Sequence, residues 1–250
     1  MHFDWPYFWS QLVTPSGAFL VGLGLTVSMA VSAEIIGVVL GIVIAEMRLS
    51  RLRALRIVAA FYVWVIRGTP LLVQIVFIYT GLAAAGIMRF QDMTFGWLTI
   101  PGNLQAGILA LGLHEGAYMA EIFRAGILAV DKGQFEAAKS LGMPPWMMMC
   151  RVVLPQALRV VLLPIGNQFN ILLKNTTLVS VIGVSEMLLV TETINSATFR
   201  TFELYAVLGI YFLILTSVWT LFMSWAERHL ALGNKAAVRN VQAIGREAES

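Results

Sequence analysis

The stretch AFLVGLGLTVSMAVSAEIIGVVLGIVIA, residues 18–45, decides the fold because it is almost wholly apolar and holds a single charged residue, Glu34. A helix crosses the hydrocarbon core of a bilayer with about 20 apolar residues. The stretch therefore predicts a membrane-spanning helix that is long enough to tilt. The whole chain agrees, with 58% apolar and 12% charged residues, against roughly 45–50% and 25% in soluble domains.

Further apolar segments extend this prediction along the chain. Those long enough to span are residues 57–86, 103–123, 153–173 and 204–226. The run 178–190 is too short, and we expect it to be a re-entrant or gate helix. Residues 18–228 are thus predicted to form one all-α integral membrane domain with about five transmembrane helices.

The basic residues predict the orientation of this domain. Placing the N-terminus outside and the C-terminus in the cytoplasm puts thirteen of the 17 basic residues inside, as the positive-inside rule requires. They are Arg48, Arg51, Arg53, Arg56, Arg124, Lys132, Lys139, Arg151, Arg159, Arg228, Lys235, Arg239 and Arg246. We expect residues 1–17, with two tryptophans and a tyrosine, to lie at the outer membrane interface, and 229–250 to be a cytoplasmic tail. The net charge of +3 thus reflects topology and lipid, not a nucleic-acid partner.

The inside segment 131–155, DKGQFEAAKSLGMPPWMMMCRVVLP, is built to dock another protein. Its centre predicts a short helix that Gly142 ends and that two following prolines prevent from continuing. Ala137 and Ala138 would allow a partner's backbone to approach closely, while Phe135, Leu141 and Met143 would offer apolar knobs. An ordinary cytoplasmic connector is the alternative.

The spacing of this segment resembles a known family. Glu136-Ala137-Ala138, then Gly142 and Val152-Val153-Leu154-Pro155, is similar to the EAA loop E-A-A-x3-G-x9-I-x-L-P of permease subunits of ABC importers, with valine for isoleucine at 152. Further stretches resemble the polar amino-acid permeases of the histidine, glutamine and arginine type. They are RGTPLLVQIVFIY (67–79), GAYMAEIFRAGI (116–127), GQFEAAKSLGM (133–143), LPQALR (154–159) and LLKNTTLVSVIGVSE (172–186). KNTTL at 174–178 departs from the expected KDTSL by the loss of a carboxylate.

The resemblance implies a subunit of the type I importer fold that forms half of a pore in the bacterial cytoplasmic membrane. Its coupling helix would seat in a cytoplasmic ATPase through Glu136, Ala137, Ala138, Leu141, Gly142 and Pro155. The implied partners are that ATPase, which would bind ATP and Mg, a second permease subunit and an extracytoplasmic solute-binding protein that delivers a polar amino acid. The chain itself would bind no cofactor.

The residues agree that the energy source lies elsewhere, because no Gly-Lys dipeptide, and hence no phosphate-binding loop, occurs in the sequence. An ion-coupled secondary amino-acid transporter is the alternative function, with intramembrane carboxylates as coupling sites. Such a carrier has no use for an ATPase-docking helix. A membrane enzyme is less favoured still, since the sequence holds neither a convincing nucleophile nor a metal cluster.

Polar residues within predicted spans are candidates for the substrate path or gate, because ionisable groups at that depth cost at least about 2.5–3.5 kcal/mol. They are Arg67, Thr69, Gln74, His114, Glu115, Lys174, Asn175 and Thr177. Arg67 could bind a substrate carboxylate, or instead pair with Glu34 or snorkel to an interface. Glu115 and His114 could receive an amino group or form a structural pair. We expect Glu121 to pair with Arg124, three residues further along one helical face.

Overall fold

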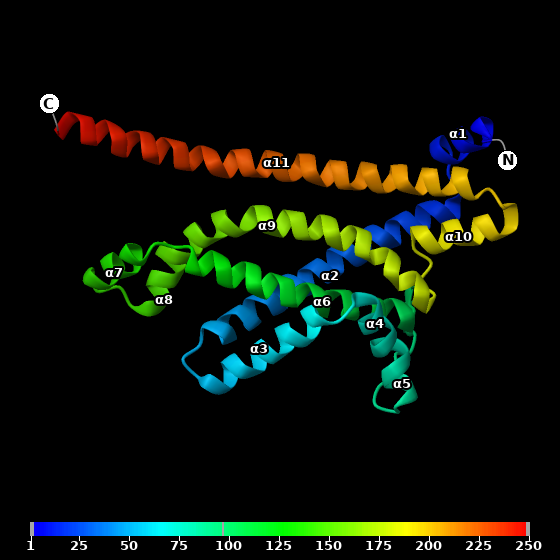
Figure 1. The fold of residues 1–250 in the computed structure, drawn as a ribbon, viewed down its shortest axis with the longest axis horizontal. Coiled ribbons are helices and arrows are strands. Elements are labelled where there is room, and N and C mark those ends of the chain that lie inside the picture. Colours follow the sequence, from blue (N-terminus) through cyan, green and yellow to red (C-terminus); the bar gives the residue numbers. More distant parts are fainter. Residues whose placement is uncertain (1–2, 97, 249–250) are drawn as a thin grey trace.

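The computed structural model describes residues 3–96 and 98–248, and nearly all of them are helical. The long helices run along the long axis of the molecule, and the two ends of the chain lie at opposite ends of it (Figure 1). The predicted all-α class is confirmed, with one small addition. Strands β1 (Met93–Phe95) and β2 (Leu98–Ile100) form an antiparallel hairpin in which Met93 pairs with Ile100.

The helices follow in a simple order along the chain. They are α1 (Trp5–Val13), α2 (Gly17–Leu49), α3 (Arg53–Gly68), α4 (Leu71–Val76), the π-helix η1 (Phe77–Gly81), α5 (Leu82–Ala84), α6 (Gly102–Leu128), α7 (Lys132–Ser140), α8 (Pro145–Met148), the π-helix η2 (Met149–Val153), α9 (Leu154–Asn175), the 3-10 helix η3 (Thr176–Ile182), α10 (Met187–Thr198) and α11 (Thr201–Ala248). The predicted tail 229–250 continues α11 as far as Ala248, and residues 249 and 250 lie outside the described part.

Within the described residues, three helical stretches are long and apolar enough to cross a membrane: Gly17–Leu49, Pro145–Ile182 and Thr201–His229. A fourth is possible if α3 and the segment Leu71–Ala84 together make one broken span. Helix α6, expected to span over 103–123, is not among these stretches. Other helices surround it and bury many of its alanines and glycines. The count of five spans and the placement of the two termini therefore remain predictions.

The structure differs from two predicted elements in detail. The single span 57–86 is bent by 108° between Gly68 and Leu71, because Pro70 lacks an N–H and restricts the residue before it to extended backbone. The single gate helix 178–190 is split at Gly183, whose φ of 81° is left-handed. A separate helix, α10, then begins at Met187, where the side chain of Glu186 accepts the N–H groups of Leu188 and Leu189, both at 2.9 Å.

Helix α6 lies at the centre of the molecule, with its closest neighbour α2 packed along it. The main core joins residues of α2, α4, α6, α9 and η3, among them the fully buried Met29, Ile75, Leu111 and Leu172. The two central helices approach so closely that a Cβ atom at Gly37 would lie 2.6 Å from Cγ of Glu115, and one at Gly41 2.4 Å from Cβ of Met119. Glycine at these positions is explained by helix packing, as the apolar sequence around them indicates.

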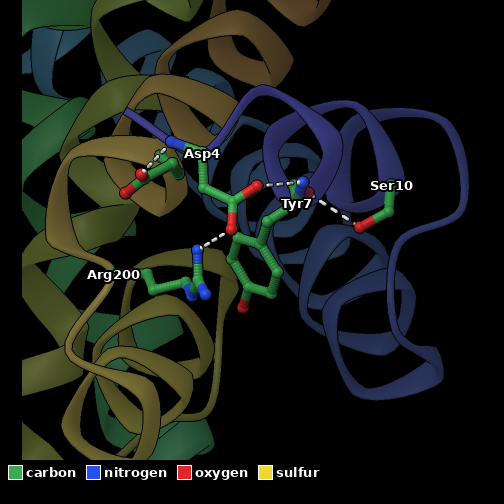
Figure 2. A network of polar contacts seen from close by, with 5 residues as sticks. Asp4, Tyr7, Ser10 and Arg200 are labelled. Carbon is green, nitrogen blue, oxygen red and sulfur yellow. Dashed lines mark hydrogen bonds and ion pairs between the residues drawn. The ribbon is translucent and has the colours of Figure 1, made fainter. Parts of the chain in front are cut away.

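At the end of the molecule opposite α7, a polar clamp ties α1 to the start of α11 (Figure 2). The Arg200 guanidinium forms an ion pair with the Asp4 carboxylate and lies 4.7 Å from the centre of the Tyr7 ring. The backbone N–H of Asp4 donates to Glu203 at 2.8 Å, and that of Tyr7 to Asp4 at 3.0 Å. The Tyr7 N–H and the Arg200 guanidinium lower the pKa of the Asp4 carboxyl.

Candidate functional site

Helix α7 forms at the centre of the predicted docking segment, and its two ends follow from local sequence. Its N-terminus is capped by Asp131, whose carboxylate accepts the N–H of Gly133 at 2.7 Å. At its C-terminus Gly142 adopts φ 69° and donates to the carbonyl of Lys139 at 2.9 Å. Pro144 and Pro145 then start the separate helix α8. The predicted short helix with a glycine stop and a proline exit is therefore present.

Helix α7 has an inner and an outer face, and the two carry different residues. Phe135 packs inward against a cluster that includes Val130, Val153 and Ala157, and Ala138 is only 3% exposed. These two residues hold α7 on the rest of the chain and do not face outward. Glu136, Ala137 and Gly142 are exposed, and so is Leu141 at 76%.

Pro155 belongs both to the predicted docking segment 131–155 and to the predicted span 153–173, and the structure places it at the beginning of α9. It follows Leu154, the first residue of that helix, and is exposed. Beside it, Val153 and Ala157 belong to the cluster that Phe135 joins. This cluster links α7 to the start of α9 through apolar contact.

At the break between α3 and α4, the side chain of Gln74 forms hydrogen bonds with the end of α3 and with Thr69. Its Nε2 atom lies 2.7 Å from the carbonyl oxygen of Ile66, 2.8 Å from Oγ1 of Thr69 and 3.1 Å from the carbonyl oxygen of Thr69. The hydroxyl of Thr69 in turn donates to the carbonyl of Val65 at 2.8 Å. Polar groups that the bent backbone frees are thus satisfied within the protein, as lipid requires.

The other end of the Gln74 side chain reaches α6, where its Oε1 atom lies 3.1 Å from Nδ1 of His114. Because the amide nitrogen faces carbonyl oxygens, Oε1 acts as the acceptor, and His114 donates through Nδ1. Both residues are buried. Three of the predicted substrate-path residues, Thr69, Gln74 and His114, are therefore brought together, and their hydrogen bonds hold the helix break in place.

Arg67 lies in the last turn of α3, just before this break. Its guanidinium is 5.0 Å from the centre of the Tyr118 ring. Both residues line a cavity of about 470 Å³ between α3, α6 and α9, together with Glu121 and Gln168. Glu121 is paired with Arg124 at 2.7 Å, as predicted, and with Arg48 at 3.4 Å. Over the described part of the chain, Arg67 forms no ion pair with Glu34.

Glu115 is fully buried between α2, α6 and α9. Its Oε2 atom accepts the side-chain N–H of Gln168 at 3.3 Å, while Oε1 has no hydrogen-bond partner. Glu115 and His114 thus point to different partners and do not form the structural pair that the sequence allowed.

Lys174, Asn175 and Thr177 lie where α9 runs directly into η3. The hydroxyl of Thr177 donates to the carbonyl of Lys174 at 2.8 Å, and Lys174 is exposed. None of the three lines the cavity beside Arg67. The predicted path residues therefore fall into separate groups: the hinge, the cavity, the buried carboxyl and this junction.

Comparison with known protein families identifies the family of this chain. The model of the family described as binding-protein-dependent transport system inner membrane component matches residues 37–232. The chain belongs to this family.

Curated relatives agree with the match. The permease is 38% identical over 220 residues to the octopine transport system permease protein OccM of Rhizobium radiobacter, covering 87% of this chain and 86% of that one. It is 34% identical over 232 residues to the glutamine transport system permease protein GlnP of Escherichia coli K12, covering 93% and 100%. For the histidine/lysine/arginine/ornithine transport system permease protein HisQ of the same strain, the identity is 33% over 222 residues, covering 89% and 97%.

Solved structures show the same relationship. A crystal structure of an amino acid ABC transporter with histidines has a TM-score of 0.79 and 40% identity, covering 92% of the permease and 100% of that chain. The MetNI methionine transporter in an inward-facing conformation has a TM-score of 0.65 at 18% identity, covering 91% and 99%, which is a likeness of fold. The permease therefore has the type I importer fold and is a transport component of the bacterial inner membrane, not an enzyme.

Sequence reasoning missed Tyr118 and Gln168 among the cavity residues. Gln168 could have been found as the lone long amide in the apolar stretch after Pro164, since polar residues at such depth are usually functional or paired. Tyr118 carries no such signal, because tyrosine is common in membrane helices. Its position opposite Arg67 depends on the angle between α3 and α4, which sequence alone does not define.

Proposed function

We propose that the permease forms one half of the translocation pore of an ABC importer for a polar amino acid and that it is driven through α7 by a cytoplasmic ATPase. The printed names of its relatives support the substrate class, since they carry glutamine, octopine or histidine, lysine, arginine and ornithine. Those named here are permeases of transport systems, and none is an ion-coupled carrier. The secondary-transporter alternative thus has no support.

The single observation that carries the coupling role is the two-faced geometry of α7. Its outer face presents Glu136, Ala137, Leu141 and Gly142 to a partner. Its inner face holds Phe135 against Val153 and Ala157, at the start of α9. A force applied to the outer face would therefore pass through close-packed apolar side chains into a helix that lines the cavity. In this proposal ATP and Mg bind to the ATPase, and this chain transmits the resulting motion.

The substrate path is proposed to include the cavity that Arg67 lines. A guanidinium without an ion-pair partner in the described residues can bind a carboxylate through two parallel hydrogen bonds, and every α-amino acid offers one. Gln168 and Tyr118 add an amide and a hydroxyl at the same cavity. Thr69, Gln74 and His114 would fix the backbone that carries Arg67. Lys174, Asn175 and Thr177, at the far end of α9, remain candidates for a gate.

The proposed assembly includes a second permease subunit, the same chain or a related one, and an extracytoplasmic solute-binding protein. Purification of the permease from native membranes with mild detergent, followed by mass spectrometry, tests this set of partners. We expect an ATPase, a permease partner and a binding protein to co-purify. Reconstituted vesicles should then hydrolyse ATP faster when the binding protein is loaded with a polar amino acid. Recovery of the permease with no ATPase subunit would contradict the proposal.

A further inference from the structure

Two buried carboxyl groups lie along the tight contact between α2 and α6. Glu115 on α6 packs its Cβ and Cγ atoms against Gly37 of α2, where a Cβ atom would lie within 2.7 Å of both. Glu34 lies three residues before Gly37, on the same face of α2. The glycine thus makes room for one glutamate side chain beside another.

Neither carboxyl is balanced by a positive charge. Both oxygens of Glu34 and Oε1 of Glu115 are buried and have no hydrogen-bond partner. The ion pairs of the described residues involve Glu121 and Asp4, and neither Glu34 nor Glu115 takes part in one. One unpaired carboxylate at membrane depth already costs several kcal/mol, and a second beside it would add repulsion.

The titratable groups on the neighbouring helices are engaged elsewhere or are exposed. On α3 the hydroxyl of Tyr62 donates to the carbonyl of Leu113 at 2.5 Å, and on α6 His114 donates to Gln74. On α9 the charged Arg159 and Lys174 are exposed, and Gln168 is uncharged. Before α10, Glu186 accepts two backbone N–H groups. None of these groups supplies a proton or a positive charge to the pair.

We propose that Glu34 and Glu115 form an intramembrane proton site, in which one proton taken from water is shared by the two carboxyls. A single proton turns two acceptors that repel each other into a donor and an acceptor. It also leaves Oε2 of Glu115 free to accept from Gln168, as observed at 3.3 Å. Because Gln168 lines the cavity beside Arg67, loss of the proton would loosen the contact of α2 with α6 and disturb the cavity wall.

The site is tested by the thermal stability of the detergent-purified complex of the permease and its partners, measured between about pH 6 and 9. Raising the pH removes the shared proton, so the unfolding midpoint of the native complex should fall by at least about 2–4 °C. Glu115→Gln and Glu34→Gln replace the shared proton by an amide hydrogen, so each should remove this alkaline fall while leaving stability at the acidic end unchanged. Glu46→Gln, at an exposed glutamate of the same helix, is the matched control and should keep the native pH profile.

Infrared spectroscopy provides a second readout, and its deciding result comes from the native protein alone. At neutral pH the native protein should show the carbonyl stretch of a protonated carboxylic acid in a water-excluded site, and either glutamine variant should lack it. Absence of this band in the native protein would overturn the proposal. So would a rise in stability when sodium replaces choline in the buffer, present in the native protein and lost in Glu115→Gln, since that result would identify a metal-cation site instead.

Discussion

At two places in the permease a helix ends at a glycine that is followed within two residues by proline. The two places differ in how the polar groups of the interrupted backbone are satisfied. After α7, Gly142 and Pro144 end the helix where nothing lies within 4 Å of the Gly142 Cβ position. Between α3 and α4, Gly68 and Pro70 also break a helix at an open Cβ position. There, however, the buried side chain of Gln74 donates its amide to the carbonyl of Ile66 across the break. Backbone N–H groups of Leu141, Gly142 and Met143 donate to carbonyls of α7 and satisfy the first break. The second is satisfied by a side chain from the next helix.

The difference teaches where each break can act. A break that leaves its outer face open is suited to binding a partner, because a substitution there changes what the partner meets before it changes the fold. A break sealed by its own side chains is suited to holding a bent backbone beside a cavity. Substitutions at the two breaks should therefore have different effects. Those after α7 should affect coupling to the ATPase, and those between α3 and α4 should affect the stability of the permease.

The largest expected effect is that of Gly142→Asp. The new side chain clashes with nothing in the permease, so its carboxylate would be buried without a partner against the ATPase. Because an unpaired charge buried at an interface costs about 2–5 kcal/mol, uptake should fall at least about thirtyfold. Uptake of labelled amino acid into vesicles measures this, with membrane insertion checked by blotting. Gly86→Asp is the matched control, because Gly86 has nearly the same φ, 68°, and equally open space, but follows α5, at a distance from α7 in the fold (Figure 1). Full uptake by Gly142→Asp would remove α7 from the coupling path.

A smaller effect, on stability this time, is expected at the sealed break. Gln74→Leu leaves the carbonyl of Ile66 and the ring of His114 without their partner, at a cost of about 1–3 kcal/mol. The unfolding midpoint in detergent should fall accordingly. Gln134→Leu, at an exposed glutamine of α7, should leave the midpoint unchanged. Equal stability of the two variants would show that the break needs no internal closure.

Sequence reasoning succeeded where one residue type has one physical consequence. Apolar length predicted the long helices, and Gly142 with the two prolines that follow it predicted a short helix with a glycine stop. It failed where the outcome depends on how helices meet. Phe135 and Ala138 face inward, and the 108° bend after Gly68 places Arg67 over Tyr118. Each of these positions is set by tertiary packing.

Arg67→Gln sharpens the contrast further, because Arg67 lies beside the sealed break but faces the cavity. Loss of a charged hydrogen-bond donor to the substrate carboxylate should weaken its binding by about 1.5–3 kcal/mol, seen as a raised half-saturation concentration for uptake. Assembly with the ATPase should not change. Unchanged uptake kinetics would take Arg67 off the substrate path.

The smallest effect is expected at the exposed clamp between Asp4 and Arg200. Because the pKa of Asp4 is lowered in the folded protein, the clamp contributes stability above the carboxyl's ordinary pKa of about 3.9 and loses it as the pH falls through the lowered value. Protection of α1 from proteolysis should thus be kept at neutral pH and lost in strong acid. Asp4→Asn should reduce it at neutral pH and flatten its acid dependence. A native acid profile in Asp4→Asn would contradict this role.

The outward face of α7 is tested most directly by photo-crosslinking in native membranes. A photoreactive amino acid in place of Leu141, which is 76% exposed, should form a covalent adduct with an ATPase subunit on illumination. The same group in place of Trp64, an exposed aromatic residue of α3 at 71%, should not capture it. An ATPase adduct at position 141 and not at 64 is the predicted result. Capture at 64 with none at 141 would contradict the account of α7 as the coupling helix.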